Sequence, residues 1–350
     1  MELEPYDTEP PRGTPPVRRF RTRIVLTALA VVVAVAIAAG IALTRTHPAS
    51  VGAGVVVIDT NLGYQNGRAA GTGMVLTSSG LVLTNNHVIR GATAIRVVVP
   101  GTGKSFTAHV VGYDVSDDVA VLQAGGASNL KTIPVGDSDS VTAGQSVKAL
   151  GNAGGTGALR PASGTVTGVD RGITVSDDQG GSESLAGMIE TNAPIQPGDS
   201  GGPLLNADGQ VVGMDTAASI GNGSEQTASA GFAIPINKAT SIAQQITHGD
   251  ASATIHIGDT AFLGVAVEAN SDGYPGAAVA SVVPGSPAAA AGLAPGDLIT
   301  SFGGQTVSSP DGLTTLVATQ SPGASTSATY VDQYGTTQTA DLALASGPPR

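Results

Sequence analysis

The chain has 350 residues and a formal net charge of −11 at pH 7, so it has room for two or three domains. This acidic balance argues against a nucleic-acid partner. The absence of cysteine excludes disulfides, a thiol nucleophile and a cysteine-ligated metal site. Only 3% of residues are aromatic and none is Trp, whereas there are 49 glycines and 21 prolines. Aliphatic cores, many short strands and frequent turns are therefore expected.

The N-terminal part combines a polar tail with a long apolar segment. Residues 1–23 are rich in proline and end in a cluster of arginines, which predicts a disordered cytoplasmic tail. Residues 24–43 carry no charge and reach the length of about 20 residues that a helix needs to cross a bilayer. We therefore predict a single transmembrane helix there, followed by an extracytoplasmic stalk over residues 44–52.

Two alternatives to this anchor stay open at the level of sequence. The small residues at positions 39–42 could host the cleavage site of a secretory signal peptide, although the apolar core of such a peptide is usually shorter. A buried helix of a globular domain is a weaker alternative, because the segment shows no amphipathic stripe.

From residue 53 the pattern changes to short apolar runs separated by turn residues. About six such runs before residue 130 suit one closed antiparallel barrel, and a second series over residues 146–234 suits another. Apolar residues at helical spacing then predict a helix over residues 237–248, with Asn237 as its N-cap. We expect residues 53–249 to form one all-β domain of two barrels.

Residues 198–203 have the sequence Gly-Asp-Ser-Gly-Gly-Pro. The glycines allow a tight turn whose N–H groups point into one small space, as a developing oxyanion requires. A serine hydroxyl is a weak nucleophile unless a base and an orienting carboxylate assist it. His87 follows an apolar run, and Asp118 directly precedes the apolar residues 119–122. Together with Ser200 they have one of the chain orders known for serine triads.

Each of these roles has an alternative. Asp117 is the second candidate for the orienting carboxylate, and Asp114 is also near in sequence. His109 lies inside a strand pattern and is better explained as a surface residue. A solvent-exposed turn serine is the alternative for Ser200. The agreement of three separate motifs in order favours the triad.

These motifs resemble those of the trypsin-like serine proteases and, among them, the HtrA (Deg) family. The resemblance extends from residue 51 to the end of the chain and is most specific over residues 191–206. It implies a chymotrypsin-like double β-barrel in which Ser200 attacks a peptide carbonyl, His87 transfers the proton and Asp118 orients the imidazole. The oxyanion hole is expected at residues Gly198, Asp199 and Ser200. HtrA relatives commonly form trimers, so a homotrimer is expected by analogy.

One residue departs from the family pattern. HtrA proteins more often have asparagine before the nucleophile, whereas this chain has Asp199, as in trypsin. In trypsin-type zymogens that aspartate pairs with a newly cut N-terminus, which a membrane tether would prevent here. We therefore hypothesise an adjustable oxyanion turn. The hypothesis fails if the unliganded structure shows both N–H groups converging and Asp199 fully satisfied.

The same resemblance places the base of the specificity pocket near Pro194 and Ile195 and its wall near residues 230–233. None of these residues is charged. An apolar, small-to-medium side chain before the scissile bond is therefore expected.

Residues 260–346 resemble a PDZ domain of the permuted bacterial type, an α+β module. The resemblance implies that the module binds the end of an extended peptide by β-augmentation. Its carboxylate would be received by backbone N–H groups around Phe262, Leu263, Gly264 and Val265. The alternative is that this apolar motif is simply a core strand.

Taken together, these features predict a membrane-anchored serine endopeptidase that cleaves misfolded or exposed extracytoplasmic proteins without a cofactor or metal. Its partners would be polypeptide substrates, peptide C-termini at the PDZ domain and the membrane. One alternative is a peptide-binding or chaperone-like scaffold with an inert protease domain. Another is a dedicated signalling protease with a single substrate.

Overall fold

The computed structural model describes residues 52–176, 182–220 and 228–350. The predicted tail and transmembrane helix, and all but the last residue of the predicted stalk, lie outside these residues. Within the described part of the chain, no helix has the length and apolar character needed to span a bilayer.

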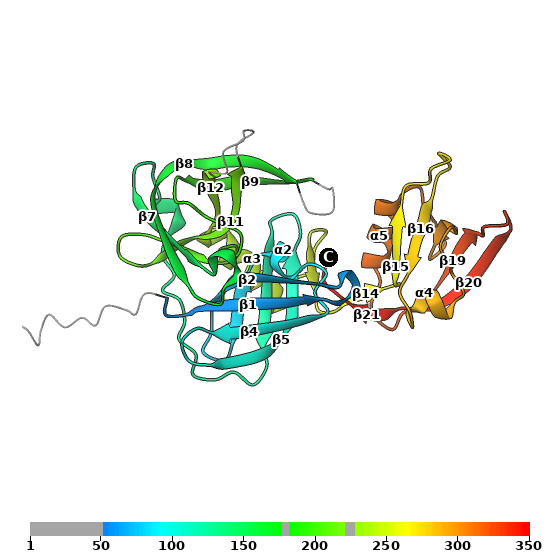
Figure 1. Cartoon of the computed structure of the whole chain (residues 1–350), viewed down its shortest axis with the longest axis horizontal. Helices are drawn as coiled ribbons and strands as arrows, with labels where there is room; N and C mark the ends of the chain where they lie inside the picture. Colours follow the sequence, from blue (N-terminus) through cyan, green and yellow to red (C-terminus); the bar gives the residue numbers. More distant parts are fainter. Residues whose placement is uncertain (1–51, 177–181, 221–227) are drawn as a thin grey trace, which may run out of the picture. The chain divides into compact units, whose positions relative to one another are not determined.

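The first barrel forms from residues 55–124 (Figure 1). Its antiparallel strands follow the order β5-β4-β1-β2-β3-β6, and β6 pairs again with β5, which closes the sheet on itself. Alternate side chains of these strands fill an aliphatic interior that includes Val56, Ile58 and Leu122. The strands are β1 (Val55–Leu62), β2 (Gly67–Val75), β3 (Leu81–Thr84), β4 (Ala94–Val99), β5 (Lys104–Asp114) and β6 (Val119–Ala124).

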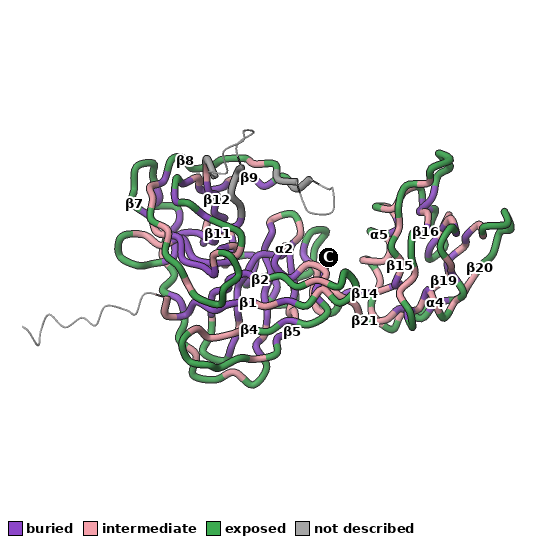
Figure 2. The backbone as a smooth tube through the Cα atoms, viewed as in Figure 1, coloured by how far each residue is buried: buried purple, intermediate pink, exposed green. Residues whose placement is uncertain are grey.

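The second barrel is also closed, with the strand order β10-β11-β12-β9-β8-β7 and a final pairing of β7 with β10. Figure 2 shows the interiors of both barrels as buried backbone enclosed by exposed turns. The strands are β7 (Ser146–Gly151), β8 (Arg160–Ser176), β9 (Ser182–Thr191), β10 (Pro203–Leu205), β11 (Val211–Ile220) and β12 (Ala228–Pro235). The expected chymotrypsin-like pair of barrels is confirmed.

Helix α3 (Ile236–His248) packs against strands of both barrels. Its buried residues Ile236, Ile242 and Ile246 join a core with Val119 of the first barrel and Met214 of the second. The helix ends at Gly249, which adopts φ +82° and donates to the last turn, as a C-terminal glycine commonly does.

The helix begins one residue earlier than predicted, and Asn237 is not its N-cap. Pro235 occupies the cap position without a side-chain hydrogen bond. The Asn237 amide instead donates to Asp137 at 2.8 Å, and the Asn237 N–H donates to Ser138 at 3.1 Å. This tertiary contact with a loop that is distant in sequence outweighs the local capping preference of asparagine.

The segment between the two predicted domains is partly a strand. Its apolar patch forms β13 (Ile255–Ile257), which pairs with β5 and extends the first sheet. The pairing is possible because β4 covers only residues 104–108 of β5, which leaves the hydrogen-bonding edge at residues 112–114 to β13.

The C-terminal module is a small sheet with the order β15-β16-β17-β19-β20, together with two helices. Each helix has a serine cap: Ser286 and Ser309 each accept from the N–H three residues on, with proline at the first helical position. The elements are β14 (Thr260–Phe262), β15 (Val265–Glu268), β16 (Ala277–Val282), α4 (Pro287–Ala290), β17 (Leu298–Phe302), β18 (Gln305–Thr306), α5 (Pro310–Ala318), β19 (Ser325–Val331), β20 (Thr337–Ala343) and β21 (Ala345–Gly347).

Candidate active site

His87 lies on a one-turn helix, α2 (Asn86–Ile89), that follows strand β3. The backbone N–H of His87 donates to Asp118 Oδ1 at 2.9 Å, and its ring Nδ1 lies 2.8 Å from Asp118 Oδ2. Because an ionised carboxylate only accepts, Nδ1 carries the proton in this pair. The imidazole therefore keeps Nε2 as its basic nitrogen.

Asp118 occupies the turn between β5 and β6, where it adopts φ +52°. Aspartate tolerates this left-handed conformation better than most residues, and strained backbone of this kind is concentrated at functional sites. The residue is buried, but its carboxylate accepts bonds from the His87 N–H, the His87 ring and the hydroxyl of Thr216. These donors compensate the buried negative charge.

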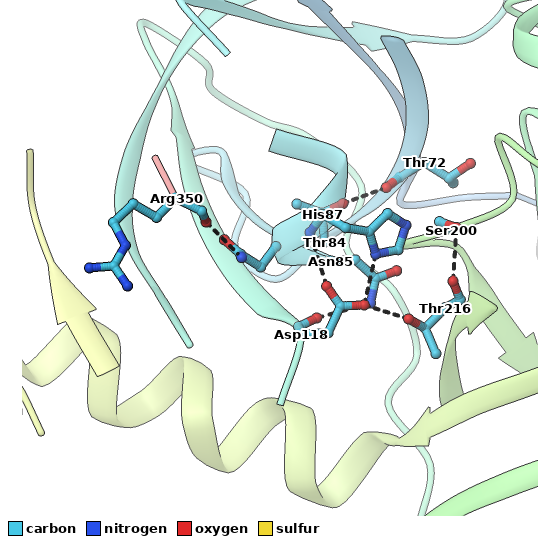
Figure 3. Close-up of polar contacts among 9 residues, drawn as sticks. Thr72, Thr84, Asn85, His87, Asp118, Ser200, Thr216 and Arg350 are labelled. Atoms are coloured by element: carbon cyan, nitrogen blue, oxygen red, sulfur yellow. Dashed lines mark hydrogen bonds and ion pairs between the residues drawn. The ribbon is translucent and has the colours of Figure 1, made fainter. Parts of the chain in front are cut away.

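Ser200 lies in the loop that leads into β10. Its hydroxyl donates to the carbonyl oxygen of Thr216 at 3.1 Å, and the Thr216 hydroxyl in turn donates to Asp118 Oδ2. A continuous set of hydrogen bonds thus connects Ser200, Thr216, Asp118 and His87 (Figure 3). The structure brings the three sequence-predicted residues into one polar cluster built from both barrels.

Thr216 is the member of this cluster that sequence reasoning missed. It lies inside strand β11, directly after Asp215 and at a shift in the register with β12, far in sequence from the three motifs that marked the site. Only the pairing of the two barrels reveals its contact with Asp118.

The turn around the serine depends on its glycines. Gly198 and Gly201 adopt φ +98° and +83°, a region that favours glycine. A Cβ at residue 201 would lie 2.1 Å from the carbonyl oxygen of Thr72, so no side chain fits there. Thr72 also clamps the turn, because its hydroxyl donates to the Gly198 carbonyl at 2.7 Å and accepts from the Asn152 N–H at 2.9 Å.

Three N–H groups were expected near the oxyanion, and they are not equivalent. The Asp199 N–H donates to the carbonyl of Gln196 at 3.0 Å and is therefore occupied. In the described part of the chain, the N–H groups of Gly198 and Ser200 donate no hydrogen bond to protein. These two remain available to a ligand.

Asp199 itself is buried and only half satisfied. Its Oδ2 accepts from the Gln196 N–H at 2.9 Å, whereas its Oδ1 has no partner within the described residues. Burial raises the pKa of Asp199, and the N–H groups of Gln196 and Ala153 act in the opposite direction. Full satisfaction of Asp199, which would have ended the hypothesis of an adjustable turn, is not observed.

The alternative residues from the sequence lie elsewhere. Asp117 forms an ion pair of 2.5 Å with Lys238 on α3. His109 is exposed on β5. Asp114 accepts from the Ser116 and Asp117 N–H groups and from Thr254, so it organises the turn that carries Asp118.

The predicted specificity pocket is only partly recognisable. Ile195 is buried in the core of the second barrel. A Cβ on Gly231 would lie 2.7 Å from Ile195 Cδ1, so the predicted base and wall are in direct contact. The absence of charge in these stretches agrees with an apolar environment.

In the C-terminal module, the predicted carboxylate-binding motif joins β14 to β15. Leu263 is buried in the module core, while Gly264 adopts φ +86° and its carbonyl accepts from the Ser286 hydroxyl at 3.3 Å. Strand β15, which begins at Val265, is an edge strand of its sheet, and Phe262 ends β14. The motif thus combines Leu263, which belongs to the core of the module, with the start of the edge strand β15.

Over residues 52–176, 182–220 and 228–350, no group of three or more His, Asp or Glu side chains could hold a metal ion.

Two domain families match this chain. Residues 71–214 match the trypsin-like peptidase domain, and residues 278–330 match the PDZ domain. Together with the two barrels, these matches show that the chain contains a trypsin-like peptidase domain followed by a PDZ domain. The chain is a homologue of the HtrA-type serine proteases, as the following relatives document.

The serine protease PepD of Mycobacterium tuberculosis is 34% identical over 310 residues, which cover 85% of this chain and 64% of PepD. The periplasmic pH-dependent serine endoprotease DegQ of Escherichia coli is 37% identical over 258 residues, which cover 72% of this chain and 54% of DegQ. A solved structure of an HtrA-type protease, an AlgW variant with a tripeptide, aligns with a TM-score of 0.50 at 29% identity. That alignment covers 85% of this chain and 95% of the AlgW chain. The present chain therefore spans about half to two thirds of the curated relatives' length.

Proposed function

We propose that this protein is a serine endopeptidase in which Ser200 is the nucleophile, His87 the general base and Asp118 the orienting carboxylate. The observation that carries the proposal is the set of hydrogen bonds that links these residues through Thr216. A buried aspartate that accepts from a histidine ring, next to a serine in a glycine turn, is the arrangement that nucleophilic acyl transfer requires.

The first step is attack of the Ser200 hydroxyl on a peptide carbonyl. Rotation about the Cα–Cβ bond of Ser200 moves its hydroxyl from the Thr216 carbonyl towards His87 Nε2, which accepts the proton. Asp118 holds the Nδ1 proton in place and stabilises the imidazolium that forms. His87 then donates its proton to the departing amine, and water hydrolyses the acyl-enzyme by the same route.

Backbone N–H groups stabilise the negative charge that develops on the oxygen of the attacked peptide carbonyl. The N–H groups of Gly198 and Ser200 are the proposed oxyanion donors, because both lack a protein partner in the described structure. Removal of one such donor typically costs about 3 kcal/mol of transition-state stabilisation. The Thr72 clamp on the Gly198 carbonyl fixes the orientation of the peptide unit that follows Gly198.

The proposed substrates are misfolded or exposed polypeptides outside the cytoplasm, cleaved after an apolar residue. Two features support this substrate class: the uncharged surroundings of Ile195 and the free edge of β15, which can pair with an extended peptide end. Relatives named periplasmic proteases support an extracytoplasmic location. The apolar segment at residues 24–43 supports a single-pass anchor, with the N-terminus cytoplasmic. Assembly into a homotrimer is part of the same proposal by analogy.

A fluorophosphonate probe tests the enzyme against the inert scaffold. The full chain is expected to react with the probe, and Ser200→Ala is expected to abolish labelling. A chain that folds but shows no labelling, with or without an added unfolded polypeptide such as casein, would support the peptide-binding scaffold instead. Retained labelling in Ser200→Ala would mean that another residue is the nucleophile.

A further inference from the structure

The helix that carries His87 is too short to keep its orientation without tertiary contacts. Helix α2 has a single turn, and one isolated turn is unfavourable because it fixes several dihedral angles for one hydrogen bond. Val88 and Ile89 anchor the helix in the aliphatic interior of the first barrel. Burial of aliphatic side chains is not directional, so polar contacts must set how the helix is rotated and where His87 lies.

Two of these polar contacts come from residues 348–350, here called the arm. The Asn86 amide donates to the main-chain oxygen of Arg350 at 2.8 Å (Figure 3). The N–H of Gly91, two residues beyond the end of the helix, donates to the carbonyl of Pro349, also at 2.8 Å. The arm therefore holds α2 at its first residue and again just after its last residue.

The Asn86 side chain is oriented by the arm. The residue is buried, and its amide nitrogen donates to Arg350. Its Oδ1 is buried with no partner among residues 52–176, 182–220 and 228–350. A buried donor that loses its acceptor is costly. Without the arm, Asn86 would have to change rotamer or α2 would have to shift, and His87 is the next residue on that helix.

Pairing of two strands brings the arm to the first barrel. Strand β21 ends at Gly347, which lies opposite Thr260 in the antiparallel pair with β14. The hydroxyl groups of Thr260 and of Tyr113, on β5, form a buried hydrogen bond of 3.0 Å. Residue 348 is therefore held close to the first barrel, and the next two residues reach α2.

The composition of the arm suits an acceptor of hydrogen bonds. Pro348 and Pro349 have no N–H and have φ fixed near −65°, so the arm presents carbonyl oxygens and is already ordered in the unfolded chain. Pro349 is buried. The Arg350 guanidinium donates to the Thr314 carbonyl on α5 at 3.2 Å, which anchors the residue whose main-chain oxygen receives Asn86.

We propose that residues 348–350 are a positioning element for the general base. The main-chain oxygens of Pro349 and Arg350 hold α2 in the orientation in which the His87 ring meets Asp118. The effect of the arm on the reaction rate rests on the proposed function, whereas its effect on the pair of His87 and Asp118 does not.

The first test is independent of catalysis and uses the full chain with Ser200→Ala. The proton on His87 Nδ1, which lies between the ring and Asp118, is expected to give a downfield proton NMR resonance. Deletion of residues 348–350 is expected to shift or broaden this resonance while thermal unfolding stays cooperative. Asn86→Ala is the second variant and decides the test if the shortened chain does not fold. An unchanged resonance in the folded variants overturns the proposal.

The second test measures the rate of fluorophosphonate labelling in chains that keep Ser200. Asn86→Ala is expected to slow labelling about fivefold and deletion of residues 348–350 about tenfold, as expected for the loss of one and two hydrogen bonds. Because both changes remove the same contact, Asn86→Ala should alter the rate by no more than about twofold once the arm is absent. Ser346→Ala is the control, since it removes an exposed hydrogen bond to Asp259 and should label at the wild-type rate.

The outcomes separate the arm from the proposed function. Wild-type labelling in both variants, or losses that simply add in the double variant, would overturn the positioning role. Labelling absent from every chain, together with a resonance that depends on the arm, would overturn the proposed function and leave the effect of the arm on His87 standing.

Discussion

His87 donates to both oxygens of the Asp118 carboxylate, from its backbone N–H to Oδ1 and from its ring to Oδ2. The contact fixes the start of α2 and the orientation of the imidazole with one buried side chain. Asp118 thus sets both the position of His87 and the tautomer of its imidazole ring. This relationship gives the sharpest prediction for the proposed mechanism.

Asp118→Asn is expected to lower kcat by about 10⁴-fold with little effect on folding. An amide in place of Oδ2 can donate to the ring, which favours the tautomer that lacks a basic Nε2. Steady-state cleavage of casein measures the effect. Asp117→Asn is the matched control, since it removes only the surface ion pair with Lys238, and such pairs contribute about 0–1 kcal/mol. Equal losses in the two variants would contradict the assignment of Asp118.

Thr216→Val is expected to reduce kcat by roughly tenfold, because a hydrogen bond to a charged group contributes about 1.5–3 kcal/mol. The valine removes the donor to Asp118 Oδ2 but keeps the backbone carbonyl that receives Ser200. Thr216→Ser retains the hydroxyl and should restore most of the activity. If serine and valine gave the same rate, the hydroxyl would have no part in positioning Asp118.

Thr72→Val is expected to slow acylation, since the clamp between the Gly198 carbonyl and the Asn152 N–H is lost. Two buried backbone groups would be left without this partner, at a cost of about 1–3 kcal/mol each in stability. Denaturant unfolding and the rate of probe labelling report the two effects. Thr72→Ser should recover both, and a valine variant with native labelling would show that the oxyanion turn does not need the clamp.

Gly201→Ala is expected to abolish labelling and to destabilise the fold, because its Cβ would collide with the Thr72 carbonyl. Gly209→Ala is the control: Gly209 has a similar φ of +77°, but nothing lies within 4 Å of the added Cβ. The control should cost only the left-handed penalty of about 1–2 kcal/mol. Comparable unfolding curves for the two variants would argue against a steric constraint at the turn.

The strand pattern of the sequence predicted two barrels and a closing helix, and three short motifs in order predicted His87, Asp118 and Ser200 as candidate site residues. These features are encoded locally, by alternating apolar residues and by glycine at turns. Thr216 could not be found in this way, because its contacts with Asp118 and Ser200 form only when the two barrels come together. Asn237 failed as a predicted cap for the same reason, since a loop far away in sequence offered its amide a better acceptor.

Helix α3 has a consequence for how this protein tolerates mutation. His87 and Asp118 are carried by one barrel and Ser200 by the other, while Ile236, Ile242 and Ile246 of the helix pack into the seam that joins them. A truncation in this seam, such as Ile242→Ala, would leave a cavity where the two barrels meet and would lower the free energy of unfolding by about 2–5 kcal/mol. The residues that carry the candidate site therefore depend on a helix that contributes no side chain to it.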